Sequence, residues 1–110
     1  MVTYNNHLSD RVWKAISDGK RRSILDALSG QPMSTGQLVE MFPTIGRTAV
    51  LKHIGILHDA DLIKVKREGR TRWNYINTKP LESVCSGWLL RHTQGVTSSI
   101  QSLKQLAEKE

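Results

Sequence analysis

Cysteine, proline and aromatic residues are scarce in this sequence, which has one cysteine, Cys85, beside three prolines and six aromatic side chains. A single cysteine cannot form a disulfide within the chain, which favours a reducing compartment. No run approaches the roughly 18 apolar residues that a membrane-spanning helix needs. The first ten residues, MVTYNNHLSD, lack the apolar centre of a signal peptide. We therefore expect a cytoplasmic protein with no membrane partner.

Sequence signals of catalysis and metal binding are missing as well. The chain has no glycine-rich phosphate loop, no paired carboxylates at catalytic spacing, and no serine or cysteine beside an identifiable histidine partner. Its histidines occur singly, whereas zinc requires three or four converging ligands. We expect no enzyme activity, no bound metal and no cofactor. One alternative remains, in which a dimer brings Cys85 near its copy or near His92 as a redox or metal sensor. A small buried cysteine on a helix face is the more common case.

Acidic residues are rare in the middle of the chain. Residues 44–79 contain eight basic and three acidic side chains, so this third of the sequence carries a net charge of +5 out of +6 for the whole. Concentrated positive charge favours a polyanion as partner. A basic surface that contacts only solvent is the alternative.

Two helices are predicted before residue 31. Residues 8–17 place Leu8, Val12, Ala15 and Ile16 on one helical face, with Trp13 at its edge.

Residues 18–30 predict the second helix, with Asp18 as N-cap and Gly30 near the end. Arg21 and Arg22, in its first turn, are expected to pair with a nearby acid rather than to contact phosphate.

A helix-turn-helix is predicted next. Ser34 and Gln37 form a capping-box pattern at the start of a short helix that Pro43 ends. A second helix is predicted over residues 46–57, with its apolar residues and His53 on one arc. In a helix-turn-helix the second helix can enter the major groove of DNA. The opposite arc of this helix contains no acid and consists of Thr48, Leu51, Lys52 and Gly55.

A β-hairpin is predicted over residues 62–77, where apolar and basic residues alternate and the alternation breaks at Glu68 and Gly69. Strands that follow a helix-turn-helix form the wing of a winged helix. The tip of this hairpin is rich in arginine, namely Arg67, Arg70 and Arg72.

A long C-terminal helix is predicted from Pro80 to the end of the chain. Apolar residues at three- and four-residue steps line one of its sides, and a small core cannot cover all of them. We therefore expect a homodimer whose interface includes Trp13, Leu81, Trp88, Val96, Ile100 and Leu103. The predicted fold is mainly α with a small β-hairpin, in a single domain. It is a winged helix-turn-helix over residues 8–79 with a C-terminal dimerisation helix over residues 80–110.

In their order and spacing, these segments resemble the ArsR-type winged helix-turn-helix transcriptional regulators of bacteria. The resemblance spans residues 12–77 and extends more loosely into the last helix. The segments that carry it are AISDGKRRSILDAL (15–28), STGQLVEMF (34–42), TAVLKHIGILHDADLI (48–63) and KREGRTRWNYIN (66–77).

The resemblance implies a homodimer that binds an inverted-repeat DNA operator and represses transcription by obstructing polymerase. Leu51 and Gly55 depart from the family pattern, which has serine and lysine there, and the Cys-x-Cys motif of the metal-sensing members is absent. An alternative function is a winged-helix dimer that serves as an adaptor for an acidic protein. The residues that the resemblance places on DNA are Ser34, Thr35, Arg47, Thr48, Leu51, Lys52, His53, Arg67, Arg70 and Arg72.

Overall fold

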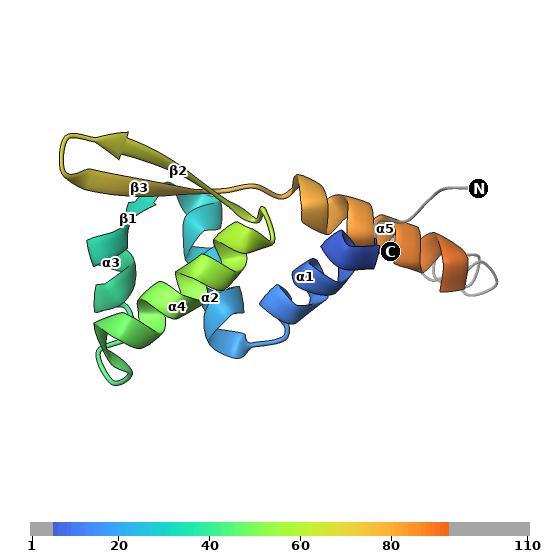
Figure 1. Cartoon of the computed structure of the whole chain (residues 1–110), viewed down its shortest axis with the longest axis horizontal. Helices are drawn as coiled ribbons and strands as arrows, with labels where there is room; N and C mark the ends of the chain where they lie inside the picture. Colours follow the sequence, from blue (N-terminus) through green and yellow to red (C-terminus); the bar gives the residue numbers. More distant parts are fainter. Residues whose placement is uncertain (1–5, 93–110) are drawn as a thin grey trace, which may run out of the picture.

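The protein folds as five helices and a small antiparallel sheet in the part of the chain that the structure describes, residues 6–92 (Figure 1). The structure is a computed structural model, and it describes side chains from residue 9 onward. None of the described helices is long and apolar enough to cross a membrane. The predicted fold class, mainly helical with one hairpin, is confirmed. In chain order the elements are α1 (Asn6–Ile16), α2 (Gly19–Gly30), β1 (Met33–Ser34), α3 (Thr35–Glu40), α4 (Gly46–Asp59), β2 (Ile63–Glu68), β3 (Thr71–Ile76) and α5 (Lys79–His92).

Two of the helices begin with the side-chain caps that the sequence predicts. The Asp18 carboxylate accepts hydrogen bonds from the backbone N–H groups of Lys20 (2.8 Å) and Arg21 (3.2 Å) at the start of α2. At the start of α3, the Ser34 hydroxyl accepts from the Gln37 N–H (3.1 Å), and the Gln37 side chain accepts in return from the Ser34 N–H (2.9 Å). These bonds satisfy donors that have no partner within the helix.

The cap on α2 makes stability dependent on pH. Hydrogen bonds from the backbone of Arg21 and Lys20 hold the pKa of the Asp18 carboxyl below its ordinary value of 3.8. A lowered pKa in the folded state means that the ionised cap stabilises the protein above pH 3.8, and that this contribution is lost as the pH falls through the lowered pKa. Asp18→Asn should therefore lower the free energy of unfolding at pH 7 more than at pH 3. Urea titrations at both pH values measure the difference, and an equal loss would contradict the assignment.

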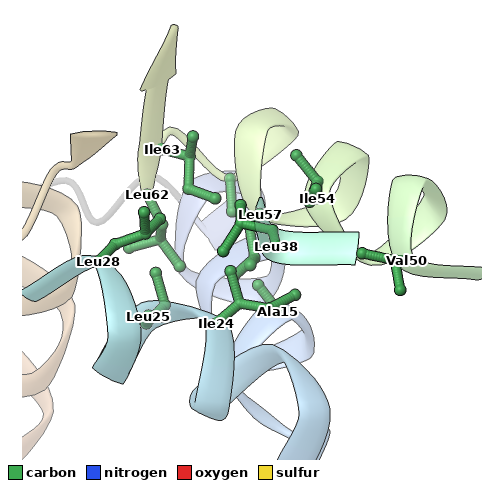
Figure 2. Packing of buried hydrophobic residues seen from close by; sticks show 11 residues of the cluster. Ala15, Ile24, Leu25, Leu28, Leu38, Val50, Ile54, Leu57, Leu62 and Ile63 are labelled. Carbon is green, nitrogen blue, oxygen red and sulfur yellow. The ribbon is translucent and has the colours of Figure 1, made fainter. Parts of the chain in front are cut away.

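The hydrophobic core lies between α2, α3 and the inner face of α4 (Figure 2). Val50, Ile54 and Leu57 of α4 are at most 3% exposed and point toward apolar side chains of the neighbouring helices and of the start of β2. Burying this arc confirms the predicted amphipathic pattern and leaves the opposite face of α4 toward solvent. The residues they meet include Ala15, Ile24, Leu25, Leu28, Leu38, Leu62 and Ile63.

The sheet has the strand order β1-β3-β2, with antiparallel pairing throughout. The predicted hairpin is confirmed, and its turn places Gly69 at a φ of +59°, a conformation that favours glycine. The two-residue strand β1, which pairs Met33 with Asn74 and Ser34 with Trp73, was not predicted. It joins the start of α3 to the middle of the hairpin, which extends beyond α3 in Figure 1.

At the other end of the molecule α1 lies beside α5 (Figure 1). The ring of Trp13 meets the ring of Trp88 edge to face, with centroids 6.4 Å apart, and Trp88 stacks on His92. Leu81 is half-buried, whereas Trp13 and Trp88 are 38% and 41% exposed. The other residues of the predicted dimer interface, Val96, Ile100 and Leu103, lie outside the described residues.

Candidate nucleic-acid interface

The outer face of α4 is exposed to solvent. Thr48, Leu51, Lys52 and Gly55 are all exposed, and Leu51 retains 39% of its surface although it is a large apolar residue. A Cβ atom added at Gly55 would meet nothing within 4 Å. Glycine weakens a helix relative to alanine, so packing within the described chain gives no reason for glycine at this position.

We call the β2–β3 hairpin the wing. A hollow lies between the start of α3, the start of α4 and the tip of the wing. It gathers three arginines and three hydroxyl groups, and no acid lines it. The structure thus brings six of the ten residues that the sequence predicts on DNA to one place. The lining residues are Ser34, Thr35, Gly36, Arg47, Leu51, Arg70, Thr71 and Arg72.

The wing tip carries positive charge that the described residues leave unneutralised. Arg67 and Arg72 are paired directly across the two strands, an arrangement of like charges that destabilises a hairpin. The Nε atom of Arg72 is buried and has no hydrogen-bond partner among the described residues. Within residues 6–92, the one ion pair joins Lys64 to Asp61, so none of the arginines at the wing tip is paired with an acid. An external anion would relieve the repulsion between the paired arginines.

A buried polar residue fixes the wing against α3. Asn74 is 0% exposed, and its Nδ2 atom donates to the Met33 carbonyl (3.2 Å) and to the Thr35 hydroxyl (3.1 Å). These bonds connect β3 to the first residue of α3, so they set the position of the wing relative to the hollow. Asn74 was not predicted as a site residue. Its signal in the sequence was a polar residue on the inward face of a strand, two residues before Ile76.

His53 is placed differently from the other predicted contact residues. It is half-buried, and its Nδ1 atom lies 3.1 Å from Nη1 of Arg21, which is only 8% exposed. The expectation that Arg21 and Arg22 pair with an acid was wrong. Arg21 donates to the carbonyls of Ala15 and Lys14, and Arg22 donates to the Ile16 carbonyl. These carbonyls lie in the last turn of α1, where a helix leaves carbonyls without an i+4 donor. The Lys14 carbonyl also accepts from the N–H and the hydroxyl group of Ser17.

Among the residues that the structure describes, no three His, Cys, Asp or Glu side chains come together as metal ligands would. Cys85 is a free, half-buried thiol on α5. His92 of the same helix stacks on Trp88 and has its Nδ1 atom 3.0 Å from the Trp88 carbonyl.

Known proteins match this chain over most of its length. The family described as "Helix-turn-helix domain" matches residues 16–66. The transcriptional repressor SdpR of Bacillus subtilis (strain 168) is 37% identical over 81 residues, which cover 74% of this chain and 88% of the repressor. The family match includes α2, α3 and α4, and residues of α3 and α4 line the hollow.

Solved structures show the same architecture. The crystal structure of an ArsR family transcriptional regulator superposes with a TM-score of 0.77 at 26% identity, covering 89% of this chain and 98% of the regulator. The solution structure of a homodimeric winged helix-turn-helix DNA-binding domain from Mycobacterium bovis superposes with a TM-score of 0.63. The latter is 19% identical and covers 80% of this chain and 82% of that domain, a likeness that shows the fold alone.

Proposed function

Because this chain belongs to the ArsR-type winged helix-turn-helix transcriptional regulators, which bind DNA, we propose that it represses transcription as a homodimer on an inverted-repeat operator. The relative from Bacillus subtilis described above is itself named a transcriptional repressor. The cytoplasm, where the genome of a bacterium lies, is the compartment that this function requires.

The hollow between α3, α4 and the wing carries the proposal. Arg47 enters it from the first turn of α4, and Arg70 and Arg72 enter it from the wing, without an acid among the lining residues. Guanidinium groups bind phosphate and the edge of guanine with paired hydrogen bonds. A DNA backbone that passes between α4 and the wing would supply the anion that the paired arginines of the wing tip lack.

A dimer places two copies of α4 on one face of the DNA. Two recognition helices about 34 Å apart enter successive major grooves, and the symmetry of the dimer then requires an inverted repeat. The exposed side chains of Trp13 on α1 and Trp88 on α5 support a dimer interface at this end of the molecule, because large apolar groups gathered on a surface mark an interface. The homodimeric domain of the M. bovis protein has the same fold. We therefore assign residues 8–79 to DNA binding and residues 80–110 to dimerisation.

Selection of bound fragments from random DNA tests the proposal directly. The purified chain should enrich one palindromic sequence, protect it from nuclease as two half-sites, and have twice the mass of one chain by light scattering. Its affinity should fall steeply with salt while the sequence preference persists. Enrichment of no sequence, together with tight binding to acidic proteins, would favour an adaptor function and contradict a repressor.

Replacing Arg47 and replacing Lys52 should weaken DNA binding in different ways. In this proposal Arg47, at the start of α4, bonds a base edge, so Arg47→Ala should relax specificity at one base pair by about 1–3 kcal/mol. In this proposal Lys52, on the exposed outer face, neutralises a phosphate, so Lys52→Ala should weaken binding evenly across sequences and lower the salt slope by about 1 per protomer. Titrations of the operator and its single-base variants separate the two effects. Identical profiles for both variants would contradict these roles.

Gly55 should show opposite effects on stability and on binding. Gly55→Ala is expected to raise the free energy of unfolding by about 0.5–1 kcal/mol, because alanine favours helix and its Cβ has open space. The same methyl group would stand between α4 and the groove, so operator affinity should fall. Gly30→Ala, at the end of α2, is the control, because its Cβ also meets nothing within 4 Å. Wild-type affinity in Gly55→Ala would show that α4 does not approach DNA closely there.

A further inference from the structure

Arg21 joins three helices through one buried side chain. Its Nε atom donates to the Ala15 carbonyl at 2.7 Å, and its Nη2 atom donates to the Lys14 carbonyl at 2.9 Å, both at the end of α1. Its third group, Nη1, lies 3.1 Å from Nδ1 of His53 in the middle of α4. Among the described residues no ion pair joins Arg21 to an acid. The guanidinium is therefore hydrogen-bonded to groups that carry no negative charge, while the Asp18 carboxylate, which accepts from the Arg21 backbone N–H, interacts with Arg21 and His53 through charge.

The contact determines where the proton of His53 lies. An arginine side chain is always protonated and has only donors, so the Nδ1 atom of His53 must accept. A histidine ring that accepts at Nδ1 is neutral and carries its single proton on Nε2. Protonation of Nδ1 would turn this acceptor into a donor and break the bond to Arg21. Nε2 has no hydrogen-bond partner among the described residues, and it is not one of the buried nitrogens without a partner. The Nε2–H group is therefore accessible to solvent, since the described residues do not bury it completely.

We propose that Arg21 is a positioning residue that holds His53 as the neutral Nε2–H tautomer, and that His53 thereby donates an uncharged hydrogen bond to a DNA phosphate. This inference rests on the proposed DNA-binding function and assigns a role to a residue that does not itself reach DNA. A phosphate oxygen is a strong acceptor, and a neutral donor binds it without releasing a counterion. His53 should therefore contribute to affinity and leave the salt slope unchanged, unlike Lys52.

The tautomer is measurable in the whole protein without any variant of Arg21. Long-range ¹⁵N–¹H correlation spectra at neutral pH should show His53 with an unprotonated Nδ1 and a protonated Nε2. Comparison with the spectrum of His53→Gln assigns its signals among the four histidines. A ring protonated on Nδ1, or on both nitrogens, would overturn the proposal.

Two substitutions at His53 separate the two ring nitrogens. Glutamine extends a donor to the position of Nε2, whereas asparagine reaches the position of Nδ1 and has no donor at Nε2. His53→Gln should bind the operator within about threefold of the wild type, and His53→Asn should lose about tenfold or more, as expected for a hydrogen bond to a charged group. Both salt slopes should equal that of the wild type. Equal losses in the two variants, or a lowered slope, would contradict a neutral donor at Nε2.

Replacement of Arg21 tests the positioning role itself. Arg21→Lys keeps one charged donor and should retain the Nε2–H signature if its ammonium reaches Nδ1, whereas Arg21→Met removes every donor and should leave His53 a mixture of tautomers with weakened binding. An unchanged His53 spectrum in Arg21→Met would overturn the proposal. If Arg21→Met does not fold, the wild-type spectrum and the His53 variants decide. Failure of the wild type to bind any sequence specifically would instead contradict the proposed function, whatever the tautomer.

Discussion

Replacing the buried Asn74 by aspartate is expected to destabilise the protein by about 3–5 kcal/mol, the cost of leaving an uncompensated charge in a buried site. The Asn74 side chain is 0% exposed and donates to two oxygen atoms, the Met33 carbonyl and the Thr35 hydroxyl. An ionised carboxylate cannot donate to either oxygen. The Met33 carbonyl would face a negative charge instead of an N–H group, and the Thr35 hydroxyl would have to turn its proton toward the new acid. Urea unfolding followed by circular dichroism measures the loss.

Asn77 provides a matched control for this substitution. Its Nδ2 atom also donates to a backbone carbonyl, that of Asp61 at 2.8 Å, but the bond lies at the surface. Asn77→Asp should therefore cost about 1 kcal/mol or less, because water can take over both groups. Equal losses in the two variants would show that burial of Asn74 does not determine its effect.

We expect the largest effect on DNA binding when the arginines at the tip of the wing are replaced. The triple variant Arg67→Gln, Arg70→Gln and Arg72→Gln removes six positive charges from the proposed dimer. At roughly 0.5 kcal/mol for each exposed charge-assisted contact, operator affinity should fall about a hundredfold or more. If each arginine neutralises one phosphate, the slope of log affinity against log salt should become shallower by about five. Fluorescence anisotropy over a salt series measures both quantities.

The opposite face of the same hairpin provides the comparison. Lys64 and Lys66 alternate with Arg67 along β2, so they project from the other side of the sheet. Lys64→Gln together with Lys66→Gln should change the salt slope by less than about one, since these charges point away from the hollow. If the affinity lost per charge were the same on both faces, the wing would act only through the net charge of the protein, and the hollow would have no special role.

The features that the sequence predicts correctly arise from residues close together in the chain. The Asp18 cap and the Ser34–Gln37 capping box each involve residues no more than three positions apart. The hairpin needs only the alternation around Gly69, and the buried arc of α4 needs only a helical period. Such patterns are local, so propensity and periodicity suffice to read them.

The features that the sequence did not predict are contacts between distant residues. Arg21 and His53 are 32 positions apart, and Asn74 and Met33 are 41 positions apart. No pattern within either segment indicates the partner, because each contact exists only after α2 has packed on α4, or β1 has paired with β3. The expectation that Arg21 pairs with an acid failed for a more local reason: its guanidinium donates to carbonyls six and seven positions earlier, at the end of α1, which no sequence pattern singles out.

The sequence predicts the positive charge of the candidate site, but it does not predict how the charged side chains are arranged in space. The excess of basic residues in residues 44–79 indicated a polyanion before any fold was known. The sequence could not show that Arg47 and Arg72 line one hollow, since this depends on β1 drawing the wing toward α3.

Arg21 also links the two ends of the molecule. It ties the last turn of α1 to α4, and Trp13 of α1 contacts Trp88 of α5. In the proposed dimer, these short contacts would connect each recognition helix, α4, to the dimer interface. The distance between the two recognition helices could then change very little. One base pair inserted between the half-sites turns one of them by about 35° relative to the other. A protein braced in this way would read the separation of its half-sites as strictly as it reads their bases.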